Sequence, residues 1–302
     1  MTMRERMVKN SQKVKRTKLT KSVIRPYLYL IPLFTFLIVF TYYPIARMFY
    51  LSLFQWGIGS KKVFIGIENY ITVSTTPLFW QVVRNNIVFS FGSVFISVSL
   101  ALFLAVLANK NLKFKGFYQS LLFYPHIIPL AVGALIWIWL FNPRQGLFNH
   151  LLGAEVNWLN SFELALPSLM VVQIWANMGY YFLLFLAGLQ NLPASLYEVA
   201  ELDGANSWQK FRHLTFPLIS STTFFVILLA IIHSIQSVDL VYLMTEGGPA
   251  NSSNLIIYYL YTEAFRWWHL DIASTISSIL FIVLLLLTAL YFILLERKVY
   301  YA

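Results

Sequence analysis

The sequence contains no cysteine and few charged residues. The absence of cysteine excludes disulfide bonds and thiolate metal sites throughout the 302 residues. Charged residues make up 11% of the chain, against about a quarter in a typical soluble domain, while hydrophobic residues make up 59%. This composition excludes an ordinary soluble domain, and we expect the lipid bilayer to be the solvent of this chain.

Sequence motifs of several common enzyme classes are also absent. No G-x-x-x-x-G-K-S/T pattern occurs among the 13 glycines, so we do not expect the chain to hydrolyse ATP by itself. Neither H-E-x-x-H nor G-x-S-x-G is present, and a pairing of Ser93 with His126 or His233 has no motif to support it. We therefore predict no catalytic residue, no metal site and no cofactor in this chain, which would not be an enzyme.

Six apolar stretches are free of Asp, Glu, Lys and Arg, and each is long enough to cross a bilayer, which takes about 20 residues in a helix. They cover residues 26–46, 85–109, 116–143, 164–197, 214–238 and 272–295. Backbone exposed to lipid must satisfy its hydrogen bonds within its own segment, and the weaker alternating pattern of a membrane barrel is absent. The sequence therefore predicts an all-α membrane protein with six transmembrane helices.

Basic residues gather at one set of the predicted helix ends. The first 25 residues contain nine Lys or Arg against one acid. The other members of this set are Lys110, Lys113, Lys115, Lys210, Arg212, Arg297 and Lys298. The opposite loops carry mostly acids: Glu68, Glu155, Glu163, Glu246, Glu263 and Asp271. Because Lys and Arg in short loops stay on the cytoplasmic side, we predict that both termini are cytoplasmic.

The basic segment 1–25 is expected to be a cytoplasmic tail, and residues 26–302 to form the transmembrane domain. A cleavable signal peptide would have an apolar run of roughly 7 to 15 residues, whereas the run here continues from Tyr27 through Tyr43 to Phe49. The tail would anchor the first helix against anionic lipid. Topology thus explains the net charge of +10, and we do not expect nucleic-acid binding.

Six tryptophans lie near the predicted membrane boundaries. They are Trp56, Trp137, Trp139, Trp158, Trp267 and Trp268. Aromatic rings of this kind sit at the level of the lipid headgroups, so we expect most of these side chains to be interfacial anchors.

Residues 195–217 form a charged, amphipathic segment between the fourth and fifth apolar stretches. A capping box at residues 195–198 predicts the start of one short helix. Gly204 suits the end of that helix, and Asn206 or Ser207 can cap a second one. We expect a compact pair of helices at the membrane surface that provides a seat for another protein.

The spacing of residues in this segment resembles a known motif. Glu198-Val-Ala200 is followed after three residues by Gly204, and nine residues later by Leu214, one further residue and Phe216-Pro217. This arrangement resembles the EAA loop of the permeases of binding-protein-dependent ABC importers, with valine and phenylalanine in place of the usual alanine and leucine. In that family the loop forms coupling helices that dock in a cleft of the ATPase subunit. The resemblance implies a coupling role for Glu198, Ala200, Glu201, Asp203, Gly204, Ala205, Phe211 and Pro217.

The resemblance covers most of the chain. Tyr43-Pro44, residues 123–125 at the expected start of the third helix, residues 140–146 and residues 246–249 look like the carbohydrate-uptake branch, which includes maltose and glycerol-3-phosphate importer permeases. It implies the type I importer fold in a bacterial or archaeal plasma membrane. It also implies four kinds of partner: a second homologous permease, two ATP-binding subunits, an extracytoplasmic solute-binding protein and membrane lipid. The partner ATPase would hydrolyse the ATP.

Polar side chains inside the apolar stretches are candidates for the solute path, because such groups usually face a cavity or a partner helix. In the fourth and fifth stretches they recur at spacings of three and four, which places them on one helix face. The predicted set is Gln173, Asn177, Tyr180, His233, Ser234, Gln236 and Ser237. Sugar hydroxyls need such neutral donors and acceptors, although hydrogen bonding between helices is an open alternative for each residue.

We predict a permease subunit for a sugar or sugar-like solute, with an oligosaccharide preferred. Glycerol 3-phosphate or another small polar solute remains open, because the second permease could supply a cation for a phosphate. An ion-coupled secondary transporter is the main alternative outside this class. It would need a carboxylate inside the membrane, and Asp239, near a helix end, is the one candidate.

Overall fold

The computed structural model describes residues 27, 29–56, 61–109 and 113–295. Within these residues the regular secondary structure is helical apart from a two-stranded antiparallel hairpin that pairs Phe54 with Phe64. The predicted basic tail 1–25 lies outside the described residues, as do Lys110, Arg297 and Lys298.

The helices and strands follow one another along the chain with short connections. Before the third span they are η1 (Ile38–Tyr42), α2 (Tyr43–Leu51), β1 (Phe54–Gln55), β2 (Val63–Phe64), α3 (Glu68–Thr75) and α4 (Pro77–Ala108). The middle of the chain forms α5 (Lys115–Ile127), α6 (Leu130–Leu140), α7 (Leu147–Leu152) and α8 (Ala165–Gln190). Then come α9 (Ala194–Leu202), α10 (Ser207–Lys210), η2 (Phe211–Thr215), α11 (Phe216–Leu218) and α12 (Ser220–Ile235). The last elements are α13 (Val238–Leu240), η3 (Val241–Thr245), α14 (Ile256–Tyr261), η4 (Thr262–Arg266) and α15 (Leu270–Leu295).

Five helical segments are long and apolar enough to cross a membrane among the described residues: Tyr29–Leu51, Pro77–Ala108, Ala165–Gln190, Ser220–Thr245 and Leu270–Ile293. The sixth span is the broken pair α5 and α6, whose axes differ by 98°. Proline explains the break: Pro125 lies inside α5 and Pro129 is the N-cap of α6, and neither has an N–H to continue the helical ladder. The prediction of six all-α spans is therefore confirmed if the bent pair is counted as one.

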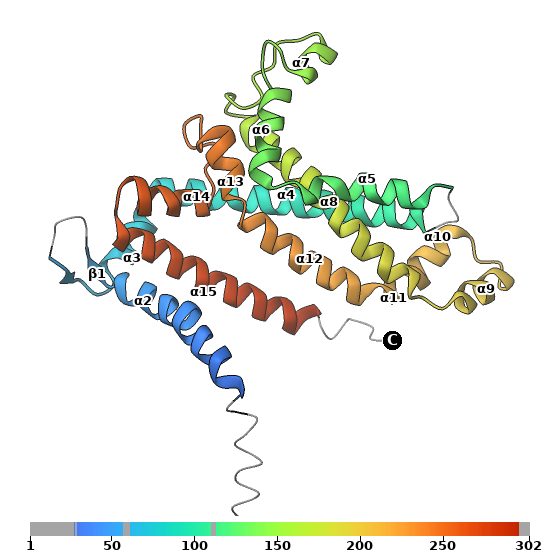
Figure 1. The fold of residues 1–302 in the computed structure, drawn as a ribbon, viewed down its shortest axis with the longest axis horizontal. Coiled ribbons are helices and arrows are strands. Elements are labelled where there is room, and N and C mark those ends of the chain that lie inside the picture. Colours follow the sequence, from blue (N-terminus) through green and yellow to red (C-terminus); the bar gives the residue numbers. More distant parts are fainter. Residues whose placement is uncertain (1–26, 28, 57–60, 110–112, 296–302) are drawn as a thin grey trace, which may run out of the picture.

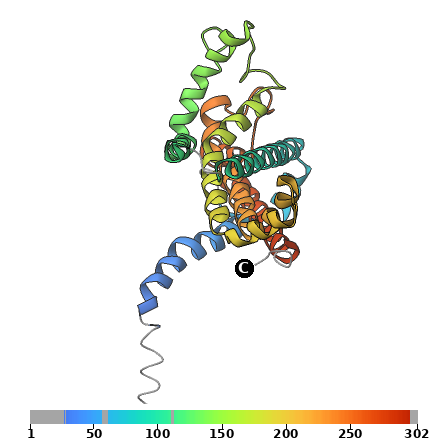
Figure 2. The same cartoon turned by 90° about the vertical axis from the view of Figure 1, so that its right-hand side faces the viewer.

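The centre of the bundle is formed by α4, α8 and α12, which pack along one another, while α5 packs on α8 (Figure 1). Small residues permit the closest approach, because a side chain at Gly179 of α8 would overlap the backbone carbonyl of Leu122 in α5. Beyond this core, α15 packs on α2 and α3. The first span extends away from the bundle in both views, and no residue of η1 is buried (Figure 2).

Two segments leave the bundle together. The upper half of the broken span, α6, contacts α13 and η3, and the three project to one side of the molecule with α7 at the tip (Figure 1). Their buried contacts centre on Trp137, Phe141 and Leu240. The remaining connections gather at the two ends of the bundle: β1, α3 and α14 at one end, which we call the far end, and α9 to α11 at the other, the coupling end.

Several sequence-based boundaries are corrected by the structure. The third helix does not start at residues 123–125, because α5 begins at Lys115 and these residues precede a break inside the span. The fifth span continues through the break after Ile235 to Thr245. Trp137 is not an interfacial anchor, because it is buried in the core with 8% of its surface exposed. Trp139, Trp267 and Trp268 are exposed, as interfacial side chains would be.

Candidate functional site

The segment 195–217 lies at the coupling end, where α9, α10, η2 and α11 form a folded unit (Figure 1). Helix α9 begins directly after Pro193, whose fixed φ suits the position before a helix. No side chain caps this helix, so the predicted capping box at residues 195–198 is wrong. The unit is nevertheless a pair of short helices, as the sequence predicts.

Gly204 ends α9 in the left-handed conformation, with φ of +75°. The Gly204 N–H donates to the carbonyl of Glu201 at 3.0 Å, and the Ala205 N–H donates to the carbonyl of Ala200 at 2.9 Å. These two bonds form a Schellman motif, which satisfies carbonyls that the helix end would otherwise leave free. Glycine at this position therefore fixes the angle at which the chain leaves α9.

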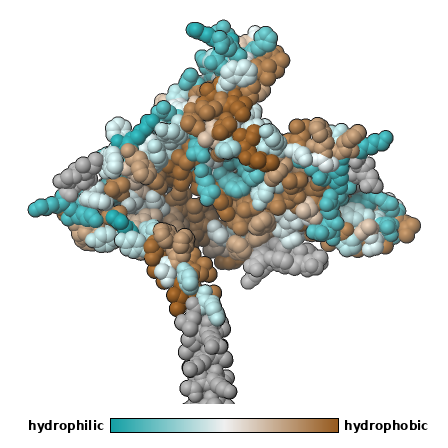
Figure 3. All heavy atoms as spheres, viewed as in Figure 1, coloured by the Kyte–Doolittle hydropathy of each residue, from teal (hydrophilic) through white to brown (hydrophobic). Residues whose placement is uncertain are grey.

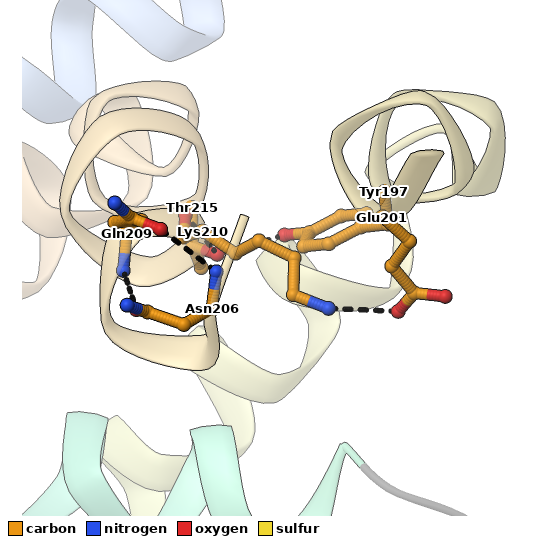
Figure 4. A network of polar contacts seen from close by, with 6 residues as sticks. All are labelled: Tyr197, Glu201, Asn206, Gln209, Lys210 and Thr215. Atoms are coloured by element: carbon orange, nitrogen blue, oxygen red, sulfur yellow. Dashed lines mark hydrogen bonds and ion pairs between the residues drawn. The ribbon is translucent and has the colours of Figure 1, made fainter. Parts of the chain in front are cut away.

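The second helix is held by reciprocal capping (Figure 4). The side-chain oxygen of Asn206 accepts from the Gln209 N–H at 2.9 Å, and the Gln209 side chain accepts from the Asn206 N–H at 2.8 Å. Of the two predicted caps, Asn206 is the one used. Asn206 and Gln209 thus form a capping box at α10, whereas the sequence-based prediction assigned one to the preceding helix, α9.

Two side-chain contacts join the helices of the coupling segment (Figure 4). Lys210 Nζ lies 2.7 Å from Glu201 Oε1, and the hydroxyls of Tyr197 and Thr215 are 3.0 Å apart. The hydrogen bond from Lys210, reinforced by its positive charge, lowers the pKa of the Glu201 carboxylate. Glu201 therefore stays ionised at neutral pH and orients α9 against α10.

The surface of this segment is apolar where a partner could reach it. The side chains of Val199, Leu202 and Trp208 are 57, 89 and 64% exposed, and the Trp208 and Phe211 rings stack at 5.7 Å. Beside them lies a groove of about 420 Å³ lined by Asp203, Gly204, Lys210 and their neighbours. Exposed large apolar side chains next to charged ones are typical of a protein interaction site.

The structure places all eight predicted coupling residues in this one unit. Glu198, Ala200 and Glu201 are on α9, Asp203, Gly204 and Ala205 form its end, Phe211 begins η2 and Pro217 is in α11. Leu202 and Trp208 are the most exposed apolar side chains of the unit, and the motif did not single them out. Both residues lie within four positions of Gly204 in the sequence, and this proximity to the motif could have indicated them.

A second group of predicted residues meets where α8 passes the end of α12. The Gln173 Nε2 donates to the carbonyl of His233 at 3.1 Å, and its Oε1 accepts from Ser237 Oγ at 2.9 Å. The Ser237 hydroxyl is also 2.8 Å from the His233 carbonyl. The backbone hydrogen bonds of α12 end here, and the carbonyl of His233 is left without a partner in the helix. Gln173 and Ser237 provide that partner.

The other predicted path residues have different surroundings. Asn177 is buried and its Nδ2 donates to the Gln173 carbonyl. The ring centroids of Tyr180 and His233 are 6.2 Å apart. Ser234 is buried and bonds the Ile231 carbonyl of its own helix. Gln236 is exposed at the end of α12 and is not joined to the cluster among the described residues. The structure thus brings Gln173, Asn177, Tyr180, His233 and Ser237 together, and does not bring Ser234 and Gln236 into the same cluster.

Two aromatic neighbours were missed by the sequence reasoning. His126, from the broken third span, stacks face to face on Tyr180 with ring centroids 4.6 Å apart. Its Nδ1 lies 3.2 Å from the Ala176 carbonyl, and Tyr181 Oη lies 3.0 Å from His233 Nδ1. The flanking prolines at 125 and 129 indicate from the sequence that His126 lies at an irregular turn, but they do not indicate that it meets Tyr180.

The cluster offers amide, hydroxyl, phenol and imidazole groups and no carboxylate, lysine or arginine among these residues. Figure 3 shows a hydrophilic patch in the middle of an otherwise apolar face, where α12 approaches the projecting α6 and α13. No group of three or more metal-ligating side chains occurs in the described part of the chain. The arrangement can exchange hydrogen bonds with a neutral polar solute.

Comparison with known proteins identifies the family. Residues 70–299 match the family described as binding-protein-dependent transport system inner membrane component. This chain belongs to that family. It is a multi-pass inner membrane protein and a permease component of a binding-protein-dependent ABC importer. Permeases of this family carry no cofactor and are not catalytic, since ATP is hydrolysed by an ATPase partner.

Relatives of this permease cover nearly its whole length. It is 34% identical over 274 residues to the probable ABC transporter permease protein YurN of Bacillus subtilis, covering 88% of this chain and 94% of the relative. It is 31% identical to the sn-glycerol-3-phosphate transport system permease protein UgpA of Brucella abortus, with 92 and 97% covered. It is 32% identical to the trehalose/maltose transport system permease protein MalF of Thermococcus litoralis, with 88 and 91% covered.

A solved structure shares the fold of this permease. The permease superimposes on a chain of a bacterial ABC transporter involved in the import of the acidic polysaccharide alginate, with a TM-score of 0.81. The match covers 93% of this chain and 99% of that chain at 22% identity. Another structure, the bacterial alginate ABC transporter in complex with alginate pentasaccharide-bound periplasmic protein, gives a TM-score of 0.78 at the same identity. These matches confirm the predicted type I importer permease fold.

Proposed function

We propose that this permease forms half of the translocation path for a sugar, with an oligosaccharide as the preferred solute. A second homologous permease would form the other half, two ATP-binding subunits would dock at the coupling ends, and a solute-binding protein would deliver the sugar from outside. The similarity to permeases named for trehalose/maltose and glycerol 3-phosphate supports a solute of this general kind.

The observation that carries the docking role is the rigid apolar surface of the coupling segment. The Schellman motif at Gly204, the Asn206 capping box and the Glu201–Lys210 ion pair fix this unit without help from another chain. Its exposed Leu202 and Trp208 are then available to a partner at little cost in ordering. We infer that this segment transmits the movement of the ATPase to α8 and α12, which lie directly before and after it.

The polar cluster on α8 and α12 supports a neutral solute over a phosphate ester. Asn177, Tyr180 and His233 can donate and accept hydrogen bonds, and the imidazole and phenol rings offer apolar faces of the kind that pack on sugar rings. A phosphate would favour arginine or lysine, and the described residues of the cluster include neither. Glycerol 3-phosphate remains the alternative solute, with the second permease as the source of the cation.

The broken spans indicate how such a path could open. The third and fifth spans are interrupted close to the polar cluster, at Pro129 and at Gln236, and their upper parts α6 and α13 pack on each other. Alternating access would move these parts relative to α8 while the coupling segment follows the ATPase. Discontinuous helices near the bilayer midplane serve this purpose in other transporters.

Purification of the importer through an affinity tag on this permease tests the proposal. We expect an ATP-binding subunit and a second permease to copurify, and the reconstituted complex with its binding protein to hydrolyse ATP faster in the presence of neutral oligosaccharides. Glycerol 3-phosphate added at the same concentration is the control solute.

If glycerol 3-phosphate alone stimulates ATP hydrolysis, the solute is glycerol 3-phosphate and not a sugar, while the assignment as an ABC importer stands. Absence of any ATP-binding subunit, together with uptake that ionophores abolish and ATP does not drive, would contradict the docking role and favour an ion-coupled transporter.

A further inference from the structure

A compact unit lies at the far end of the bundle, away from the polar cluster and from the coupling segment (Figure 1). It consists of the hairpin β1–β2 and helix α3, and we call it the far-end unit. The chain enters it from Leu51, at the end of the first span, and leaves it at Pro77, at the start of α4. It therefore lies where two membrane spans emerge.

The far-end unit exposes several large apolar side chains. Val63 and Phe64 of β2 are 53 and 65% exposed, and Ile67 and Ile71, one helical turn apart, are 66 and 54% exposed. In α3 itself Asn69 and Val73 are buried, so the helix packs with the opposite side and leaves Ile71, and Ile67 at its N-cap, exposed among the described residues. We refer to these four exposed apolar side chains together as the apolar patch.

The patch is continuous with the exposed surface of the first span. Tyr50, near the end of α2, is 52% exposed, and its ring centroid is 4.5 Å from that of Phe54. The Phe54 ring in turn is 5.3 Å from the Phe64 ring. A row of three aromatic rings therefore leads from the exposed surface of the first span into the hairpin, and we infer that the membrane surrounds both.

Aromatic and basic side chains border the patch as they border a bilayer. Lys62 Nζ lies 4.3 Å from the centre of the Trp56 ring, and Lys61 is exposed beside it. The exposed Trp80 donates its Nε1–H to the Ser74 carbonyl at 2.8 Å. Tryptophan prefers the headgroup level, and lysine can lie along an apolar surface with its ammonium among phosphates.

Buried and partly buried hydrogen bonds tie the far-end unit to the first and last spans. The Asn69 side chain donates to the carbonyls of Ser52 and Phe54, both at 3.0 Å. The Tyr70 hydroxyl lies 2.7 Å from Ser52 Oγ and 2.8 Å from Ser278 Oγ of α15. The Trp56 N–H donates to Asp271 at the start of α15. The unit cannot move relative to these helix ends without breaking buried bonds.

We propose that the far-end unit is an interfacial lipid anchor, with Val63, Phe64, Ile67 and Ile71 immersed among the phospholipid headgroups and upper acyl chains and with Lys61 and Lys62 at the phosphates. In the orientation proposed above, this is the outer leaflet. Through its bonds to Ser52, Ser278 and Asp271 the anchor sets the depth of the first and last spans in the bilayer. The proposal depends on the membrane location of the family and not on the identity of the solute.

Single-cysteine spin labelling tests this proposal, since the chain contains no cysteine of its own. The Phe64→Cys and Ile71→Cys variants, each assembled in the importer and placed in phospholipid nanodiscs, are labelled with a nitroxide. The matched controls are Thr72→Cys, the next residue of α3, and Leu151→Cys on α7, both exposed positions. Oxygen, which concentrates in lipid, and a water-soluble nickel chelate are used as relaxing agents.

We expect relaxation by oxygen to exceed relaxation by the nickel chelate at positions 64 and 71, and the order to be reversed at 72 and 151. Nickel-dominated relaxation at 64 and 71 would overturn the lipid anchor. Protection of 64 and 71 from nickel only after the solute-binding protein is added would also overturn it, and would make the patch a protein docking face. All four positions are on the surface, and an unchanged gel-filtration profile of the complex verifies assembly.

Discussion

At the scale of single residues, this permease depends on a few positions where the backbone of one helix reaches the side chain or backbone of another. Gln173 satisfies a carbonyl of the interrupted α12, and His126 covers one face of Tyr180. Gly179 lets α5 approach α8 without an intervening side chain. In a membrane, where the hydrophobic effect does not drive helices together, such close packing and buried hydrogen bonds hold the bundle.

Gly179→Ala should destabilise the bundle, because the added methyl group would overlap the backbone carbonyl of Leu122. The backbone of α5 cannot move aside as a flexible side chain could. Overpacking costs about 1–3 kcal/mol, and we expect the upper end of that range. Gly116→Ala in α5 is the matched control, since a methyl group there meets nothing within 4 Å. Thermal unfolding of the detergent-solubilised complex should show a lower midpoint for Gly179→Ala alone. Equal midpoints for the two variants would contradict the tight α5–α8 contact.

At the scale of elements, the coupling segment owes its shape to local rules. A Schellman motif, a capping box and one ion pair are each formed within a few residues of sequence. The spans are different, because α5 and α12 each end partway along a candidate span and contact groups of α8 there. Local sequence therefore shapes the segment that we propose as the docking unit, and packing between helices shapes the proposed path.

Gly204→Ala should weaken retention of the ATPase subunit, because alanine in the left-handed conformation costs roughly 1–2 kcal/mol and the chain would leave α9 at another angle. Gly204→Asn should be milder, since asparagine tolerates this conformation. Gly153→Ala, at φ of +65° after α7, imposes the same backbone strain elsewhere and serves as the control. The measurement is the amount of ATPase copurified with each variant. Comparable losses for positions 204 and 153 would show a general folding defect instead of a docking defect.

At the scale of the whole molecule, connectivity and charge combine into one topology. With the broken pair counted as one span, six crossings place the segment between α8 and α12 on the same side as both termini, and α7 on the opposite side. From the distribution of lysine and arginine we expect the coupling end to lie on the cytoplasmic side. The far-end unit and α7 would both lie outside.

Labelling of introduced cysteines in intact cells checks this orientation. Leu202→Cys and Leu151→Cys replace side chains that are 89 and 72% exposed, in a chain without native cysteine. A membrane-impermeant maleimide should label position 151 in intact cells, and position 202 only after the cells are permeabilised. The opposite pattern would invert the topology, and labelling of both positions in intact cells would contradict the single membrane crossing, Ala165–Gln190, that separates them.

The sequence by itself determined the class of this protein, the number of spans and the place of the coupling segment. Apolar length is a property of composition, because any stretch of about 20 apolar residues must be shielded from water. The EAA spacing and Gly204 can likewise be recognised from a short stretch of sequence, since a Schellman motif involves six consecutive residues. These features were therefore accessible without any knowledge of packing.

Only the tertiary structure decided which polar residues meet. Gln173, Ser237 and His126 come from three spans, and spacing along one helix predicts a shared face but not the neighbour that the face meets. For the same reason Ser234 and Gln236 fitted the pattern and are not part of the observed cluster. The far-end unit likewise follows from long-range bonds such as the one between Trp56 and Asp271. Contacts between residues distant in sequence depend on how whole helices bend and pack, and proline breaks alter both.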